Sequence, residues 1–367
     1  MRLENLSLTN FKNYEILEID FQREVNCIVG INGSGKTNLL DAIHYLSLTK
    51  SAFNSIDSQN IKHENDFFSV RGRFVLHEKV YSLQCSLKNR QKKIFKVDGK
   101  PYEKISEHVG RFPVVLINPN DTDLIREGSE IRRRFVDSIV SQMDHNYLLD
   151  LIKYNHVLKQ RNSLLKKFSE TNTFDKDLIE PFDLQLLSVG RRIFEKRQSF
   201  LTSFKPLFKT HYDNLSEKRE ETSIKYHSDL LSTNFKEDFL NNIKKDLALQ
   251  RTTAGIHKDD FLFEINNFPL KKFGSQGQQK SFVIALKLAQ FDLIKEKKGF
   301  VPILLLDDIF DKLDDLRINK LMEMLINESF GQVFITDARP ERTQRIFESL
   351  DIPMQIFHVE NGGIIGK

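Results

Sequence analysis

The glycine-rich stretch near the start of the chain carries the residue types that can bind a phosphate chain. It reads Gly30, Ile31, Asn32, Gly33, Ser34, Gly35, Lys36 and Thr37, with the spacing GxxxxGK[ST]. Backbone N–H groups approach a phosphate closely only where side chains are absent, which explains the glycines. A helix beginning at the loop adds partial positive charge facing the anion. We therefore expect Lys36 to reach the β- and γ-phosphates of a nucleotide and the Thr37 hydroxyl to hold Mg²⁺.

The sequence on either side of this loop predicts the elements that must position it. The apolar run Cys27-Ile28-Val29 is typical of a buried strand, and the segment from Asn38 to Ile43 is typical of a helix. A glycine-rich turn that matched the spacing by chance would lack this context. The order strand, loop, helix therefore favours a nucleotide site.

A second motif with site chemistry lies far along the chain. Four apolar residues, Ile303–Leu306, end in Asp307 and Asp308. Such a strand delivers an acid at its carboxyl end, and in nucleotide-binding proteins that end lies beside the phosphate loop. We expect Asp307 to hold Mg²⁺, directly or through water, and Asp308 to orient or deprotonate the attacking water. The alternative is a strand that simply ends in two solvated acids.

A third stretch of small and amide residues precedes a helix. It consists of Ser275, Gln276, Gly277 and Gln278. Such residues can form a second anion-binding helix start, or an ordinary capped helix with Ser275 or Gln276 near the cap. The helix that follows has an apolar stripe at helical spacing, formed by Phe282, Ala285, Leu286, Ala289 and Leu293.

Length and composition bound the remaining possibilities. With 367 residues and a net charge of +4, the chain is long enough for two domains and only mildly basic. Its two cysteines form neither a metal cluster nor a disulfide framework, and Cys27 is expected in the core. The start lacks a signal-peptide layout, and no apolar run is long enough to cross a bilayer. We therefore expect a cytoplasmic protein without a membrane partner.

The pattern along the chain changes twice. Residues 1–29 and 65–120 indicate strands, including a hairpin with Asp98-Gly99 at its turn. From 121 to 245 long helical patterns dominate, and strands alternate with helices again from about 250. We predict an α/β domain formed by residues 1–120 and 246–367, with a helical arm of residues 121–245 inserted.

Basic residues recur along the predicted arm and are candidates for contacts to DNA phosphates. They are Arg132, Arg133, Arg134, Lys166, Lys167, Arg191 and Arg192. A solvated helix face is the alternative for each, and the three consecutive arginines could equally pack or form ion pairs at the junction with the arm. No motif reads base edges, so sequence-specific recognition is not expected.

Taken together, these strings resemble the RecF family of bacterial recombination mediators, which are SMC-like ABC ATPases. The resemblance spans nearly the whole chain in order. It is carried by residues 10–14, 30–37, 128–129, 132–137, 251–252, 254–255, 258–260, 275–279 and 306–310. It implies an α/β fold: a P-loop ABC-type ATPase head with a β-rich lobe and an inserted helical arm.

The resemblance also implies a function. The segment Ser275–Gln278 corresponds to the family's signature, which in one subunit closes on the γ-phosphate held by the other, and Leu313-Asp314 resembles the D-loop. ATP then drives head-to-tail dimerisation on single- or double-stranded DNA and at gap junctions, and hydrolysis releases the dimer. The family cooperates with RecR, and through it RecO, in loading RecA at single-strand gaps during repair, replication restart and the SOS response.

Two positions depart from the pattern of ABC ATPases. Many of them carry a histidine after a late strand, where this chain has Thr336, so we expect Thr336 to contact the γ-phosphate or water instead. Asp308 replaces the longer glutamate, so we expect ATP hydrolysis to be slow and to act as a switch.

Two other functions fit the phosphate loop. The nucleotide-binding subunit of a membrane transporter would explain the loop and signature, but not the helical insert; binding to DNA rather than to a permease separates the two. A P-loop kinase would leave the signature redundant, and dimerisation with ATP would contradict it.

Overall fold

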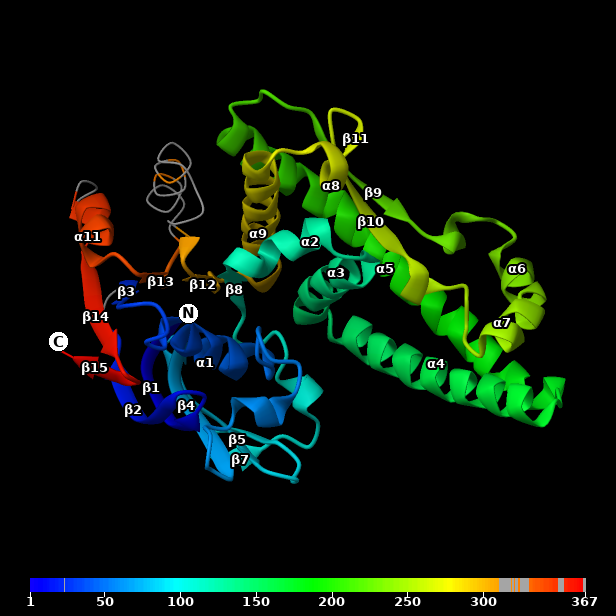
Figure 1. Ribbon diagram of the computed structural model, residues 1–367, viewed down its shortest axis with the longest axis horizontal. Helices are drawn as coiled ribbons and strands as arrows, with labels where there is room; N and C mark the ends of the chain where they lie inside the picture. The colour runs from blue at the N-terminus through cyan, green and yellow to red at the C-terminus, as the bar shows by residue number, and fades with distance from the viewer. Residues whose placement is uncertain are drawn as a thin grey trace. The chain divides into compact units, whose positions relative to one another are not determined.

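A computed structural model describes residues 1–22, 24–309, 318, 320, 323, 330–348 and 353–365 (Figure 1). The chain divides into two compact units. The first unit comprises residues 1–121 and 284–367, and the second unit comprises residues 122–283. The first unit therefore contains both ends of the sequence, and the second is inserted between them.

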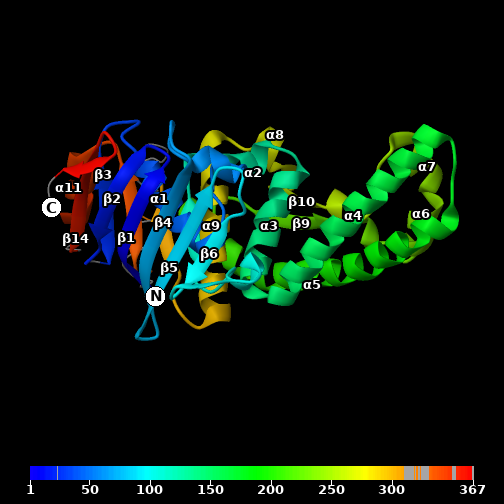
Figure 2. The ribbon, with the colours of Figure 1, turned by 90° about the horizontal axis from the view of Figure 1, so that it is seen from below.

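One sheet of the first unit is antiparallel and has the strand order β2-β1-β4-β5-β6-β7 (Figure 2). Its strands in chain order are β1 (Arg2–Phe11), β2 (Tyr14–Asp20), β4 (Phe67–Leu76), β5 (Lys79–Lys88), β6 (Ile94–Val97) and β7 (Lys100–Pro101). Buried and exposed residues alternate along β2 from Leu17 to Asp20, as expected for a sheet with one face on the core. The predicted hairpin is confirmed, because Val97 of β6 pairs with Lys100 of β7 across Asp98 and Gly99.

The other sheet of the first unit has the order β15-β14-β3-β13-β12-β8. Its strands are β3 (Val25–Val29), β8 (Val114–Ile117), β12 (Ile303–Leu306), β13 (Val333–Asp337), β14 (Met354–Glu360) and β15 (Gly363–Ile365). All its neighbours pair in parallel except β14 and β15. Every residue of β8 and β12 is buried, which explains their uninterrupted apolar sequences.

Helix α1 (Lys36–Leu48) contacts strands of both sheets. Leu39, Leu40, Ile43 and Leu46 are fully buried, so most of this helix belongs to the core of the first unit. Cys27 is buried there as predicted. Among the described residues, the other short elements of this unit are η1 (Asp57–Asn60), η2 (Ile105–Glu107) and α11 (Pro340–Glu348), and η3 (Pro119–Thr122) ends where the second unit begins.

The second unit is mainly helical. Its helices are α2 (Asp123–Arg126), α3 (Ser129–Met143), α4 (His145–Thr171), α5 (Lys176–Ser216), η4 (Asp229–Leu231), α6 (Phe235–Asn241), α7 (Ile243–Leu249), η5 (Ile256–Lys258) and α8 (Leu270–Phe273). Helices α4 and α5 run side by side (Figures 1 and 2). Both begin at aspartate caps, because Asp144 accepts from the Tyr147 N–H and Asp175 from the N–H groups of Asp177 and Leu178.

A small sheet in the second unit has the order β11-β10-β9. Its strands are β9 (Thr222–His227), β10 (Asp260–Ile265) and β11 (Phe268–Pro269). Strand β9 lies inside the segment predicted to be helical, and it pairs with β10 from Thr222↔Ile265 to His227↔Asp260. This pairing places residues 260–265 in the second unit, which continues to residue 283, beyond residue 245 where the predicted arm ends.

Helix α9 (Gln276–Lys298) starts in the second unit and continues into the first. All five residues of its predicted apolar stripe are buried. No helix in the part of the chain that the structure describes combines the length and apolar character needed to cross a membrane.

Candidate nucleotide-binding site

The glycine-rich loop connects β3 to α1, as the sequence predicts. Gly35 precedes the helix with φ of +119°, a value that residues with a side chain rarely adopt. A Cβ at Gly35 would lie 2.5 Å from Asn13 Nδ2 and 2.8 Å from Tyr14 Oη. The turn between β1 and β2 therefore packs so closely against the loop that only glycine fits at this position.

Lys36 lies across the loop that precedes it. Its Nζ donates to the carbonyl oxygens of Gly30, at 2.8 Å, and Ile31, at 3.0 Å. The residue is 5% exposed, so the ammonium group is held in place with little solvent around it. An ammonium has three N–H donors. One donor of Lys36 therefore remains for an anion in the loop.

Thr37 and Asp307 come together as the sequence predicts. The Thr37 hydroxyl donates to the Asp307 carboxylate, at 2.9 Å from Oδ1 and 3.1 Å from Oδ2. Burial raises the pKa of Asp307 and the neighbouring Asp308 adds to this, while hydrogen bonds from Thr336 and Thr37 oppose it. A hydroxyl and a carboxylate side by side are oxygen ligands of the kind Mg²⁺ takes together with phosphate oxygens.

Thr336, on β13, is fully buried. Its hydroxyl donates to Asp307 Oδ1 at 2.7 Å and accepts from the Asp308 N–H at 2.9 Å. Thr336 does not line the cavity beside the phosphate loop. The geometry thus favours a role in positioning Asp307 and Asp308 over the direct contact with phosphate or water predicted above.

A cavity of about 320 Å³ adjoins the loop. Its lining residues are Asn32, Gly33, Gly35, Lys36, Thr37, Asn38 and Asp308. Asp308 takes φ of +49°, in the left-handed region, and it is the acidic residue of this lining. The structure thus brings both predicted acids to the loop, with Asp307 against Thr37 and Asp308 at the cavity.

A nucleoside triphosphate with Mg²⁺ fits these residues. The loop offers backbone N–H groups without side chains at Gly33 and Gly35, and Lys36 supplies positive charge. The buried Ser34 Oγ makes no hydrogen bond within the described part of the chain, so it can serve a ligand. We infer that Lys36 would hold phosphate oxygens, and that Thr37 and Asp307 would hold the metal.

Three polar residues with no predicted role fix the loop from outside. Asn13 Nδ2 donates to the Ser34 carbonyl at 3.0 Å, and Asn38 Nδ2 donates to Asn13 Oδ1 at 2.7 Å. The Tyr14 hydroxyl donates to the Gly35 carbonyl at 3.0 Å. The left-handed residues Asn10 and Lys12 on either side of Phe11 mark a tight turn there, but nothing in the sequence pairs that turn with the loop.

The signature-like stretch forms a capping box at the start of α9. The Gln278 N–H donates to Ser275 Oγ at 3.2 Å, and the Ser275 N–H donates to Gln278 Oε1 at 2.6 Å. Gln278 Nε2 also donates to Glu220 at 2.8 Å. The capped-helix alternative is therefore realised, and it leaves the anion-binding role as a proposal. The predicted D-loop, Leu313-Asp314, lies outside the described residues.

The first two of the three consecutive arginines hold parts of the second unit together. Arg132 pairs with Asp260 at 2.7 Å, and Arg133 donates to the Asp259 carbonyl at 2.6 Å. The ion-pair alternative is therefore realised for Arg132, whereas Arg133 is held by a hydrogen bond to the backbone. Arg134 pairs with Glu130 on the surface.

The other basic candidates are exposed, on α4 and α5. Lys166 lies 3.7 Å from Glu170, Arg191 lies 2.8 Å from Glu195, and Arg192 lies 2.5 Å from Asp150. Lys167 is exposed next to Lys166. These four residues stay candidates for DNA contacts, although nearby carboxylates offset part of the charge of three of them.

Comparisons with known proteins identify the family of this chain. Residues 2–364 match the family model described as RecF/RecN/SMC N terminal domain. The chain is 49% identical over 98% of its length to the DNA replication and repair protein RecF of Flavobacterium johnsoniae, whose whole length is covered.

Solved structures show the same relationship. One described as "Structure of the recombination mediator protein RecF-ATP in RecFOR pathway" is 31% identical, with a TM-score of 0.89, covering 99% of this chain and 96% of that one. An Smc head bound to the C-winged helix domain of ScpA shares the fold, at a TM-score of 0.57 and 16% identity, covering 99% of this chain and 96% of that one. The predicted SMC-like ABC ATPase fold is confirmed. The chain belongs to the RecF family.

Proposed function

We propose that this chain is an ATP-dependent DNA-binding clamp that acts in DNA replication, repair and recombination. The contact that carries the proposal is that of the Thr37 hydroxyl with the Asp307 carboxylate, because it joins the phosphate loop to the acid of a distant strand. Membership of the RecF family supports the DNA-related part, and a relative solved with ATP supports the nucleotide.

The chain's own residues would divide the work. Lys36 and the loop amides would bind the triphosphate, Thr336 would position Asp307, and Asp308 would orient a water molecule. Mg²⁺, when bound, would neutralise charge on the phosphate oxygens. Because Asp308 is shorter than glutamate, we propose slow hydrolysis that resets the clamp.

ATP would join two copies head to tail, with Ser275–Gln278 of one copy closing on the nucleotide of the other. The ATPase head would comprise residues 1–120 and 246–367, and residues 121–245 would form the arm. We further propose that the clamp works in the cytoplasm with RecR, and through it RecO, to support RecA loading at single-strand gaps, replication restart and SOS induction.

Light scattering with and without ATP–Mg²⁺, repeated with gapped DNA, tests this function. We expect a monomer that becomes a dimer with ATP, more readily with DNA. Lys36→Met should abolish ATP binding, Asp308→Asn should trap the ATP-bound dimer, and Ser275→Arg should block dimerisation while the monomer still binds ATP. The matched control is Lys62→Met, which removes a lysine paired with Glu15 on the surface.

Two outcomes would contradict the proposal. A wild-type protein that binds ATP but stays monomeric with DNA would leave only a P-loop fold. Normal ATP affinity in Lys36→Met would refute the assignment of the loop.

A further inference from the structure

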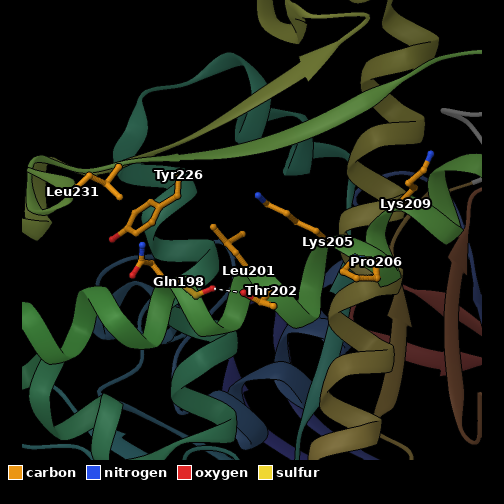
Figure 3. A pocket seen from close by; sticks show the side chains of 8 residues that line it. All are labelled: Gln198, Leu201, Thr202, Lys205, Pro206, Lys209, Tyr226 and Leu231. Atoms are coloured by element: carbon orange, nitrogen blue, oxygen red, sulfur yellow. Dashed lines mark hydrogen bonds between the residues drawn. The ribbon is translucent and has the colours of Figure 1, made fainter.

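A groove in the second unit lies between α5 and strand β9. One stripe of α5 lines it, formed by Gln198, Leu201, Thr202, Lys205, Pro206 and Lys209, and Tyr226 and Leu231 form the other wall. The cavity measures about 770 Å³. Figure 3 shows the side chains of Leu201 and Lys205 extending from the helix toward the strand that carries Tyr226. Nothing in the proposed nucleotide switch uses this groove.

Both walls of the groove are anchored from behind. Phe208 of α5, next to the groove stripe, packs on Phe282 with ring centroids 4.5 Å apart, so this part of the helix is held in place by a buried aromatic contact. Tyr226 stacks on Phe261 at 4.9 Å with an angle of 8° between the rings, and its hydroxyl donates to Asp259. A ligand would therefore meet a largely pre-formed surface.

Strand β9 is an edge strand along this groove. In the small sheet its hydrogen-bonded neighbour is β10, and no other strand in the described part of the chain pairs with its outer edge. The outward N–H and C=O groups of an edge strand are a template for another strand. Tyr226 contacts Phe194 of α5, so the sheet packs over the helix. A strand added beside β9 would continue that layer over Leu201 and Pro206.

The lining combines apolar surface with positive charge. Leu231 is 55% exposed, and Pro206 and the Tyr226 ring add further apolar surface. Lys205 forms no ion pair with any described carboxylate, whereas Lys209 lies 3.1 Å from Asp213 with a 60% exposed side chain. Negative charge on a ligand would be complementary to these two lysines. The apolar surface of Pro206, Tyr226 and Leu231 favours a peptide over a nucleic acid backbone as the ligand.

We propose that the groove binds an extended segment of a partner protein in which apolar and acidic residues alternate. The segment pairs with the outer edge of β9, places apolar side chains on Leu201 and Leu231, and places carboxylates near Lys205 and Lys209. Because side chains alternate along a strand, one face of the segment meets the apolar side chains of the groove, and the carboxylates of the other face lie within reach of the long Lys205 and Lys209 side chains.

The test uses the full-length chain and a short fluorescein-labelled peptide of alternating valine and aspartate. Fluorescence anisotropy should show saturable binding that weakens at least about ten-fold when lysine replaces aspartate in the peptide. Lys205→Glu and Leu231→Asp should each weaken binding by a similar factor. Lys176→Glu, on the same helix but outside the groove, should not. Both groove positions are exposed, so we expect both variants to fold.

Backbone pairing is tested separately. An N-methylated form of the peptide should lose binding, because it lacks N–H donors for β9. Hydrogen exchange of residues 222–227 should slow when the unmethylated peptide binds.

Three results would overturn the proposal. The first is no saturable binding of the valine–aspartate peptide, or binding that Lys205→Glu and N-methylation leave unchanged. The second is displacement of the peptide by a single-stranded oligonucleotide whose own binding needs Lys205, which would make the groove a nucleic-acid site. The third is self-association of the chain that Leu231→Asp abolishes, which would make the occupant a second copy.

Discussion

The cores of the two units of this protein differ in the side chains that they bury. In the first unit a large apolar cluster gathers residues from both sheets and from α1, including Leu6, Leu40, Phe68 and Phe334. In the second unit the two largest fully buried side chains are arginines, Arg161 and Arg197. The first unit is therefore stabilised mainly by the apolar area it buries, and the second also depends on ion pairs of defined geometry.

Each buried arginine connects segments that are far apart in sequence. Arg161, on α4, binds Asp183 and Asp246 at 2.6 Å each. Arg197, on α5, binds Asp137 at 2.9 Å and Asp259 at 2.8 Å. An amphipathic helix offers only a stripe of apolar surface, whereas a guanidinium reaches several carboxylates at once. A helical unit can therefore be held together by a few buried ion pairs.

The largest effect is expected from removing one of these arginines. Arg197→Ala leaves Asp137 and Asp259 without their cation in a buried site, which should cost about 3–5 kcal/mol. Urea unfolding followed by circular dichroism measures the loss, and hydrogen exchange should place it in residues 122–283. Arg197→Lys, which keeps the charge but not the fork, should cost less. If Arg197→Ala were as stable as the wild type, the second unit would not depend on this buried ion pair.

Acid should weaken both units, because each buries a neutral histidine. Burial lowers the pKa of both His108 and His257 to about 4. Each Nε2 donates to a backbone carbonyl, of Leu46 or Thr252, and each Nδ1 accepts from a tyrosine hydroxyl. The unfolded chain, with an ordinary histidine pKa near 6.5, binds more protons than the folded chain between these values.

Stability from these histidines is therefore complete above pH 6.5 and is lost as pH falls toward 4, by about 3 kcal/mol per histidine. Urea unfolding at a series of pH values measures this slope. His108→Gln keeps one donor and one acceptor without a titrating group, so it should flatten the slope in the first unit alone. An unchanged slope would show that His108 does not titrate in this range.

A smaller effect is expected from the buried ion pair of the first unit. Lys12 lies 2.6 Å from Asp41, whose side chain has no exposure. Asp41 also accepts from the Ser51 hydroxyl and the Ala52 N–H, at 2.6 and 2.7 Å. Since these donors remain in Lys12→Met, the loss of stability should be about 1–3 kcal/mol. Urea unfolding measures it, and a loss as large as that of Arg197→Ala would remove the distinction between the units.

The smallest effect is expected on the surface of α5. Arg191 pairs with Glu195 at 2.8 Å, but both side chains are more than half exposed, at 59% and 56%. Arg191→Ala should change stability by less than about 0.5 kcal/mol in urea unfolding. DNA binding at low salt gives a second readout, because a phosphate contact at Arg191 would weaken it.

The sequence by itself determined the parts of this protein that depend on neighbours along the chain. The loop from Gly30 to Thr37, the buried strand before Asp307 and the stripe of α9 were all predictable, because spacing and apolar periodicity are local properties. The ABC-type fold was predictable because these motifs occur in a family's order. Strand β9 was missed, because its short alternation lies within long helical patterns and its partner β10 comes after a long intervening segment.

Only the tertiary structure decided which distant residues meet. Strand β13 lies between β3 and β12, and this order places Thr336 within hydrogen-bond distance of Asp307. The same is true of Asn13 on the loop and of Arg132 on Asp260. The sequence gives the charge and length of each side chain, but its partner depends on strand order and long-range packing. The physical reason is that these contacts form between segments whose separation in the chain carries no periodic signal.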